Sequence, residues 1–315
     1  MSVFLTALVA VAVLLATAAP GYILKKKNMV SEDAMPALSK LLLYVCQPCL
    51  TIYSFGIIEF SLETLKNIGI FALAVAIIHV VMLGGAYLCL RGRSKEPLYR
   101  ILTIATTFSN CAFFGIPIIE ALLPETASEL IVYTSVYAIV MNVFAWTAGS
   151  AIIANDPGYV KVKSVFLNPP VISIAIAVAL YVLRVPLSSF KPLFDMITVA
   201  GRMSTPVSML IMGMRLATVD LKRMWCDVRI YLTIAVNQLF MPALVFVALL
   251  ALQGLDPDLR RVLFIISACP AASVVLNYAE VIGEGQREAA NVVLLSTILS
   301  VLTLPFMMLL LPLIN

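Results

Sequence analysis

Residues 104–124 read Ile-Ala-Thr-Thr-Phe-Ser-Asn-Cys-Ala-Phe-Phe-Gly-Ile-Pro-Ile-Ile-Glu-Ala-Leu-Leu-Pro, a stretch long enough to cross a bilayer but interrupted near its middle. Ser109 and Asn110 place hydrogen-bonding side chains where a membrane helix is normally apolar, and Gly115 and Pro117 weaken the helical backbone. In lipid, a freed backbone group is costly unless protein or a water-filled cavity satisfies it. The stretch therefore predicts a broken helix inside the molecule, the kind of place where transporters bind substrates.

A second interrupted stretch lies late in the chain. Residues 265–280 read Ile-Ile-Ser-Ala-Cys-Pro-Ala-Ala-Ser-Val-Val-Leu-Asn-Tyr-Ala-Glu, with Pro270 near the centre and small residues around it. Asn110 and Pro270 are 160 residues apart. We expect these two broken stretches to be counterparts of each other.

Further landmarks repeat at nearly the same separation. A separation of 160 relates Glu120 to Glu280, and one of 158 relates Pro48 to Pro206. These matches indicate a chain made of two related halves. The alternative is coincidence among frequent proline and glutamate residues, because identity between the halves is otherwise faint.

The composition is that of a polytopic membrane protein. Of the 315 residues, 62% are hydrophobic and 12% are charged, and the mean hydropathy is +1.04. A water-soluble globule could not bury that many apolar side chains. The basic pI of about 8.7 comes from lysines and arginines in loops, so it bears on orientation in a membrane and not on nucleic acid.

At about 20 apolar residues per helical span, the sequence predicts ten transmembrane helices in an all-α fold. They cover residues 3–24, 36–58, 67–90, 100–122, 128–153, 165–184, 195–217, 230–252, 260–281 and 289–313. The first run lacks a preceding basic residue and is followed by three lysines, which is the reverse of a cleavable signal peptide. Residues 1–154 and 155–315 would each hold five spans. An odd number turns the second half upside down, giving a 5+5 inverted repeat.

Basic residues predict the orientation. We assign to the cytoplasmic side Lys25, Lys26, Lys27, Lys40, Arg91, Arg93, Lys95, Arg100, Lys161, Lys163, Arg215, Lys222, Arg223, Arg229 and Arg287. The outer side receives Lys66, Arg184, Lys191, Arg202, Arg260 and Arg261. This bias places both termini, Met1 and Asn315, outside a multi-pass protein of the cell (inner or plasma) membrane.

No residue pattern indicates an enzyme, a cofactor or a metal site. A single histidine excludes a His-Glu-x-x-His zinc helix, and neither a Gly-x-Ser-x-Gly elbow nor a phosphate-binding Gly-x-x-x-x-Gly-Lys run is present. The six cysteines lie mostly in apolar spans and indicate small buried hydrophobes. Cys46 and Cys49 form a Cys-x-x-Cys, but no second pair accompanies them to favour zinc or redox chemistry.

Uncharged polar residues within the predicted spans are the remaining candidates for a binding site. They are Gln47, Ser109, Asn110, Asn142, Asn237, Gln238, Ser273, Asn277 and Asn291. Any one of them could simply hydrogen-bond to a neighbouring helix, which contributes about 0.6–2 kcal/mol. Asn110 differs from the others because it lies at a helix break, which favours a functional role.

Ionisable residues in or near the spans could have a functional or a structural role. His79 lies among isoleucines and valines in the middle of the third span, as a proton relay would, but a neutral histidine bonded to a neighbouring helix would give the same pattern. Glu120 and Glu280 lie at the ends of the broken spans, where we expect them to be solvated.

Several motifs resemble the auxin efflux carrier family. They are Gly-Tyr-Ile-Leu-Lys-Lys-Lys at residues 21–27, Gln47-Pro48, Ser-Asn-x-x-Phe-x-Gly-x-Pro at residues 109–117, and Pro270. The resemblance covers essentially the whole chain, and the motif at residues 109–117 is its most specific part. The family includes plant PIN proteins and bacterial carriers of malonate and other organic acids. Short loops make this chain similar to the bacterial type.

The resemblance implies a fold related to bile-acid sodium symporters. Spans 1, 2, 6 and 7 would form a scaffold domain, and spans 3–5 and 8–10 a transport domain in which broken helices 4 and 9 cross. The family's crossover asparagine and second crossover proline map onto Asn110 and Pro270, and Asn142 matches a fifth-span asparagine by position alone. Ser109 stands where plant members have proline. The sodium-site pattern of bile-acid symporters is not evident, so no sodium site is expected.

The predicted function is secondary transport of small organic anions, mono- or dicarboxylates that are auxin-like or malonate-like, by an elevator-type alternating-access mechanism. The predicted substrate-binding residues are Gln47, Ser109, Asn110, Cys111, Asn142, Pro270, Ala271 and Ser273. Since no fixed cation is expected at the centre, asparagine amides and half-helix N-termini would hold the anion.

The alternatives are a ligand-sensing membrane receptor built on a carrier fold, a channel and an intramembrane enzyme. The chain shows neither a cytoplasmic output domain nor a nucleophile with a base. The expected partners are the substrate, the lipid bilayer and a second copy of the chain. A homodimer through scaffold helices is predicted from the family analogy and the apolar faces of spans 2 and 7.

Overall fold

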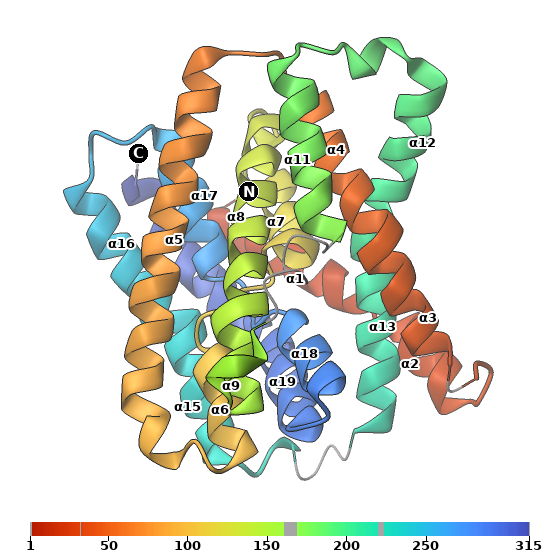
Figure 1. Cartoon of the computed structure of the whole chain (residues 1–315), viewed down its shortest axis with the longest axis vertical. Coiled ribbons are helices and arrows are strands. Elements are labelled where there is room, and N and C mark those ends of the chain that lie inside the picture. Colours follow the sequence, from red (N-terminus) through yellow and green to blue (C-terminus); the bar gives the residue numbers. More distant parts are fainter. Residues whose placement is uncertain (1, 32, 161–168, 220–223, 315) are drawn as a thin grey trace.

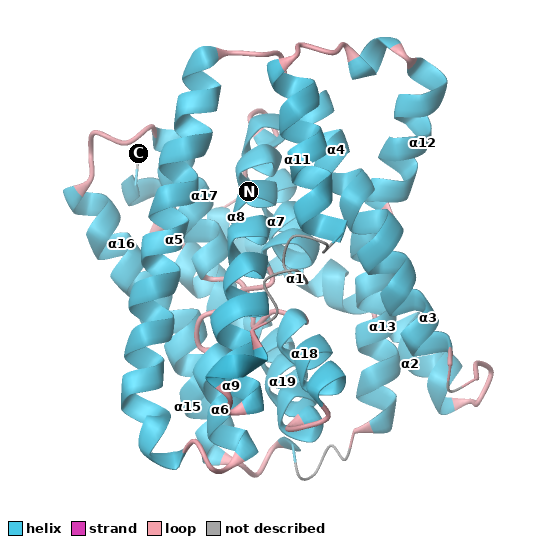
Figure 2. Ribbon diagram, in the orientation of Figure 1, coloured by secondary structure: helices cyan, strands magenta, loops and turns pink. Residues whose placement is uncertain are grey.

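The computed structural model describes residues 2–31, 33–160, 169–219 and 224–314, and helices make up most of these ranges (Figure 1, Figure 2). Within them the only β-type pairing is a single isolated bridge. The expected placements of Met1, Lys161, Lys163, Lys222, Arg223 and Asn315 lie outside the described residues.

The first half of the chain contains nine α-helices, several of them joined by π-helical or 3-10 turns. The α-helices are α1 (Val3–Ala16), α2 (Ala19–Lys26), α3 (Ala34–Leu41), α4 (Gln47–Gly56), α5 (Leu62–Leu90), α6 (Pro97–Ala105), α7 (Ile116–Leu122), α8 (Ala127–Phe144) and α9 (Ser150–Ala154). The π-helical turns are η1 (Leu42–Cys46), η3 (Cys111–Gly115) and η4 (Ala145–Gly149). The 3-10 turns are η2 (Arg91–Arg93) and η5 (Pro157–Tyr159).

The described part of the second half follows a similar order. Its α-helices are α11 (Pro169–Val182), α12 (Lys191–Arg202), α13 (Ser204–Thr218), α15 (Val228–Ala235), α16 (Met241–Ala251), α17 (Pro257–Ser267), α18 (Val274–Ile282) and α19 (Gln286–Met308). The turns are the 3-10 segments η6 (Leu187–Ser189) and η8 (Leu311–Ile314) and the π-helical η7 (Val236–Phe240).

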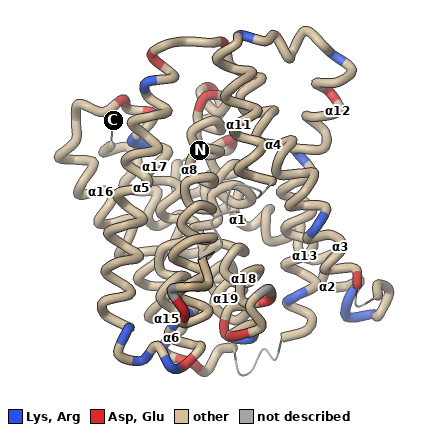
Figure 3. The backbone as a smooth tube through the Cα atoms, in the orientation of Figure 1, with Lys and Arg blue, Asp and Glu red and all other residues tan. Residues whose placement is uncertain are grey.

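Among the described residues, six helical units are long and apolar enough to cross a membrane. They are Val3–Lys26, Ala34–Gly56, Leu62–Arg93, Ala127–Ala154, Val228–Ala251 and Gln286–Met308. Of the other four expected spans, one includes the short helix α11 and three are interrupted between α6 and α7, α12 and α13, and α17 and α18. Charged residues gather toward the upper and lower ends of the molecule in Figure 3. The all-helical membrane fold is confirmed, and the count of ten spans stays a prediction.

The two interrupted stretches have the local chemistry that ends helices. α6 ends at Ala105, and helix resumes only at the π-helical turn before α7, in which Pro117 takes the second position. Proline has no backbone N–H, so Pro117 removes one hydrogen bond from the continuous helix Cys111–Leu122 close to the junction of the π-helical turn with α7. α17 ends at Ser267 and α18 begins at Val274, with Pro270 between them.

The helices pack in two sets. In the first set, on the right in Figure 1, α2 packs on α13, and α4 packs on α11 and α12. In the second set, α5 packs on α8, α6 on α19 and α16 on α17. α1 also contacts α7 and α19. The α2–α13 contact is backbone to backbone, since a Cβ on Gly21 would lie 2.0 Å from the Leu210 carbonyl oxygen and one on Gly213 would lie 1.9 Å from that of Ala18. Only glycine permits such an approach, so this part of the first set is tightly joined.

Candidate functional site

The two broken stretches meet at their breaks. The Asn110 backbone N–H donates to the Pro270 carbonyl oxygen at 2.7 Å, and the Ala272 N–H donates to the Phe108 carbonyl oxygen at 2.8 Å. These two bonds form the isolated antiparallel bridge. Backbone groups that each break frees therefore satisfy one another, which meets the requirement that lipid imposes on an interrupted helix.

Polar side chains of neighbouring helices support this bridge. Ala271 N–H donates to Ser296 Oγ at 3.2 Å, and Gln238 Nε2 donates to the Ser296 carbonyl oxygen at 2.7 Å. Asn237 Nδ2 donates to the Thr106 carbonyl oxygen at 3.3 Å. Asn237 and Gln238, both from η7, thus bind helix to helix, which was the structural alternative for this group of residues.

Asn110 is held at the bridge but has an unused donor. Its carbonyl oxygen accepts from Gly115 N–H at 3.1 Å, which starts the second half of the broken helix. The residue is 3% exposed, and its Nδ2 has no partner among the described residues. A buried donor without an acceptor costs about 1–3 kcal/mol. This amide is therefore available to an acceptor that enters the site.

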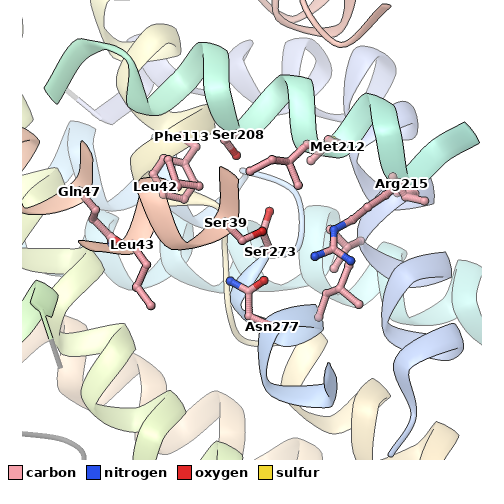
Figure 4. Close-up of a pocket in the computed structure, with 14 residues that line it drawn as sticks. Ser39, Leu42, Leu43, Gln47, Phe113, Ser208, Met212, Arg215, Ser273 and Asn277 are labelled. Atoms are coloured by element: carbon pink, nitrogen blue, oxygen red, sulfur yellow. The ribbon is translucent and has the colours of Figure 1, made fainter. Parts of the chain in front are cut away.

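A small polar cavity lies between the two sets of helices (Figure 4). It measures about 50 Å³, and Ser39 and Gln47 of the α3–α4 segment face Ser273 and Asn277 across it. Its lining is Ser39, Leu42, Leu43, Gln47, Phe113, Ser208, Ile211, Met212, Arg215, Ser273, Leu276, Asn277, Val293 and Leu294. Because both sets contribute hydroxyl and amide groups, a polar ligand there would touch both.

The predicted substrate-binding residues fall into three groups. Gln47 and Ser273 line the cavity. The buried residues around the bridge do not line it, and these are Ser109, Asn110, Cys111, Pro270 and Ala271. Asn142 does not line the cavity either, and its Nδ2 donates to the Ala138 carbonyl oxygen of its own helix at 2.7 Å. Phe113, in the same π-helical turn as Cys111, connects the bridge with the cavity.

Arg215 corrects two expectations. The expectation of no fixed cation at the centre is wrong for this cavity, because the Arg215 guanidinium lines it. The expectation that Glu280 is merely solvated is also wrong, because both of its carboxylate oxygens accept from Arg215, Oε2 from Nη2 at 3.2 Å. The Arg215 side chain is 15% exposed and that of Glu280 is 43% exposed. This ion pair joins α13 to α18 in the two-pronged geometry that guanidinium and carboxylate groups favour.

A second cavity, of about 280 Å³, lies elsewhere between the two sets. Glu120 of α7 and Arg202 of α12 both line it, together with Tyr53 and Thr205. Arg202 Nη2 donates to the Tyr53 hydroxyl at 2.9 Å, and its guanidinium lies 5.4 Å from the centroid of that ring. Glu120 is exposed and makes no ion pair with any other residue that the structure describes. This second arginine and glutamate are therefore near one cavity but not joined.

His79 is buried on α5 among aromatic rings. Its Nδ1 lies 2.8 Å from the Val75 carbonyl oxygen, so Nδ1 carries the proton and donates. The ring centroids of Phe108, Tyr137 and Phe144 lie 5.9, 5.3 and 5.3 Å away. In the described part of the chain, His79 Nε2 has no hydrogen-bond partner. The proton relay stays a prediction.

Comparison with known families settles the class of protein. A family model described as membrane transport protein matches residues 6–308. The chain belongs to the auxin efflux carrier family. A comparison with curated proteins gives no match. As an auxin efflux carrier family member, the chain is a membrane transporter.

Sequence reasoning missed Ser39, Ser208 and Arg215. The serines looked like ordinary helix residues, and Arg215 was counted only as a charge at a span end. One signal pointed to Arg215, a lone guanidinium in a methionine-rich apolar segment whose neighbours on both sides are buried or half-buried. Among the residues that the structure describes, no three His, Cys, Asp or Glu residues gather as metal ligands would.

Proposed function

We propose that this protein is a secondary carrier of small organic anions, mono- or dicarboxylates of the auxin-like or malonate-like kind. The observation that carries the proposal is Arg215 in a polar cavity between two sets of helices. A guanidinium binds a carboxylate through two parallel hydrogen bonds. The Glu280 carboxylate occupies this guanidinium in the present structure, so a substrate carboxylate would take its place when the ion pair separates.

The substrate would be held from both sides of the cavity. Arg215 and Ser208 of α13 would meet one end of the anion, and Ser273 and Asn277 would donate from the facing wall. Asn110 would add its unused amide from the bridge once the cavity extends toward it. Ligand pockets commonly measure about 300–1,000 Å³, whereas this cavity is about 50 Å³. The two sets of helices therefore separate when the substrate enters.

Movement of one set against the other gives alternating access. The set containing the tight α2–α13 contact would be the scaffold, and the set carrying the bridge between the breaks would move with the substrate. This elevator-type motion fits ten spans in a 5+5 inverted repeat, residues 1–154 and 155–315, with broken helices 4 and 9 crossing at Asn110 and Pro270. The two half-helices that start after the breaks would add their positive ends to the site.

The proposal places the carrier in the cell membrane as a homodimer. Both termini would lie outside, and scaffold helices would form the dimer contact, because a stationary partner helps one domain to move against the other. Native mass spectrometry in mild detergent and in lipid discs tests the assembly. A monomer under both conditions would remove the dimer from the proposal.

Uptake into liposomes tests the transport function. Purified protein is reconstituted and offered labelled acetate, malonate, succinate and indole-3-acetate, with a pH gradient, a sodium gradient or neither. We expect saturable uptake of at least one carboxylate, and the gradient that drives it identifies the coupling ion. Arg215→Gln removes the charged hydrogen bonds and is expected to lower affinity by about 10-fold or more, since such bonds contribute about 1.5–3 kcal/mol.

Arg287→Gln is the matched control, because Arg287 is exposed and does not line the central cavity. It is expected to take up the same carboxylate as the parent does. The proposal is wrong if no carboxylate is carried. It is also wrong in its choice of site if Arg215→Gln and Arg287→Gln behave alike.

A further inference from the structure

A large cavity lies at the periphery of the second set of helices, beside α5, α6 and the α8–α9 segment, and away from the central cavity. It measures about 440 Å³, within the range of about 300–1,000 Å³ that small-molecule sites occupy. One wall is a face of α5 that includes Val80, Gly84 and Tyr87. The opposite wall, from α8 to α9, includes Phe144 and Ala148. The side chains that line most of its length are apolar.

The cavity is unfilled and opens toward the surroundings of the protein. Nothing lies within 4 Å of the position that a Cβ on Gly84 would occupy. Val80 is 59% exposed, and Tyr87 is also exposed. In a chain that crosses a membrane, an exposed apolar face meets acyl chains. An unfilled apolar space open to the bilayer loses contacts unless a hydrocarbon chain enters it.

One end of the cavity is polar and positively charged. Arg91 and Ser94 lie there, next to Arg100 of α6. Arg100 is 6% exposed; it donates through Nη1 to the Ile153 carbonyl oxygen at 2.5 Å and through Nη2 to Glu284. Its Nε has no partner among the described residues. Because this Nε is covered by protein, the accessible positive charge at this end is the exposed Arg91, which favours an anionic ligand there.

Two carboxylates lie near this end. Asp156 borders the cavity, and its Oδ1 accepts from Gly158 N–H at 2.8 Å, while Glu284 is paired with Arg100. Of the two arginines on the lining, Arg91 makes no ion pair among the described residues, so its guanidinium is the one left for an anionic ligand. Arg91 is exposed and follows the end of α5, at the depth where lipid headgroups would lie for a helix of this length.

We propose that this cavity binds a glycerophospholipid with an anionic headgroup. One acyl chain lies between α5 and the α8–α9 segment, and the phosphate accepts hydrogen bonds from Arg91 and Ser94. The long apolar lining with a single polar end matches a lipid and does not match a small carboxylate. The charged end matches an anionic headgroup better than a zwitterionic one.

Two adjacent glycines provide a matched test. Gly84 lines the cavity and Gly85 does not, yet a Cβ at either position would meet nothing within 4 Å. Gly84→Phe therefore fills the cavity, whereas Gly85→Phe adds the same side chain outside it. The whole carrier, purified in mild detergent, is titrated with dioleoyl phosphatidylglycerol, and bound lipid is counted by native mass spectrometry.

We expect Gly84→Phe to bind the lipid at least about 10-fold more weakly than the parent, which corresponds to ~1.4 kcal/mol, and Gly85→Phe to bind as the parent does. Arg91→Gln is expected to weaken phosphatidylglycerol binding while leaving the weaker binding of dioleoyl phosphatidylcholine unchanged. If Gly84→Phe fails to fold, Ala148→Leu fills the same cavity from the other wall. Equal lipid binding by the cavity-filling variant and Gly85→Phe overturns the proposal, as does a parent protein that binds both lipids equally.

Discussion

Two arginine and glutamate combinations lie at different places between the two sets of helices. Arg215 and Glu280 are joined, beside a cavity of about 50 Å³. Arg202 and Glu120 are not joined, and the cavity that they line is about 280 Å³. Both arginines belong to the α12–α13 segment, and the glutamates lie on α18 and α7, the second halves of the two broken stretches.

The difference suggests that the same arginine–glutamate arrangement occurs twice, once with its charges joined and once with them separated. The glutamates are the residues that the 160-residue separation relates, and each has an arginine of one helical segment nearby. On the Arg215 side, which the charge bias predicts to be cytoplasmic, the ion pair lies beside a small cavity. On the Arg202 side, Arg202 instead contacts Tyr53 and the space stays open. A carrier that alternates would exchange these arrangements, forming the second pair as the first one separates.

Asn110 lies at the bridge where the broken stretches meet, so changing it should weaken binding whichever side is open. Asn110→Ala removes an amide that can donate to a carboxylate, and we expect a loss of about 1–3 kcal/mol, roughly 5- to 150-fold in affinity. Asn110→Asp should be worse, because its charge repels the anion. Binding of the identified substrate to the purified protein measures both.

A structural role for Asn110 predicts something different. Both variants would then fold, reach the membrane and bind substrate as the parent does. In that case the amide serves only helix packing, and the site is confined to the cavity around Arg215.

The Arg215–Glu280 pair should control access to the small cavity from one side of the membrane only. Arg215→Glu sets two carboxylates against each other, and we expect it to destabilise the closed arrangement by about 1–2 kcal/mol, a factor of about 5–30. The side chain of Glu280 is partly exposed, which limits the effect. Ser208, buried beside the small cavity, is replaced by cysteine in a chain without its six natural cysteines, and its labelling by a membrane-impermeant reagent from the cytoplasmic side is measured.

The exchanged pair is the control for this prediction. Arg215→Glu combined with Glu280→Arg restores the opposite charges and should return labelling to the level of the parent. Unchanged labelling in Arg215→Glu alone would show that the pair does not close this side. Labelling that rises from the outer side instead would reverse the orientation derived from charge bias.

The sequence was sufficient to locate the breaks but not their charged surroundings. Polar residues and proline within apolar runs show directly where a helix cannot continue, and the helices end beside Asn110 and Pro270. Arg215 and Glu280 are 65 residues apart, and their contact depends on how α13 and α18 pack. Each by itself looks like a charge at a span end. Asn142 shows the same limit, since its bond to its own helix depends on a side-chain conformation that spacing does not reveal.

Glu120 should have a smaller effect than Glu280, because it is exposed and unpaired in this arrangement. Glu120→Gln prevents an ion pair with Arg202 in the alternate state. An exposed pair contributes about 0.2–1 kcal/mol, so we expect at most a roughly fivefold rise in labelling of Thr205→Cys from the outer side. Glu125→Gln is the control, because Glu125 is exposed nearby and does not line the cavity. Equal effects of the two changes would show that Glu120 does not form an ion pair with Arg202 in the alternate state.

Replacing His79 is expected to leave access from both sides of the membrane unchanged. Its Nδ1–H is bonded to the Val75 carbonyl oxygen of its own helix, and aromatic rings surround it, so the structure provides no hydrogen-bonded partner to pass a proton on. A glutamine can donate the same bond, and we expect His79→Gln to preserve the pH dependence of uptake, although stability can fall by about 1 kcal/mol. Uptake by proteoliposomes under imposed pH gradients measures this, with thermal unfolding as the control for stability. A folded His79→Gln carrier that transports but no longer responds to the gradient would establish the proton relay, because packing alone does not alter which gradient drives uptake.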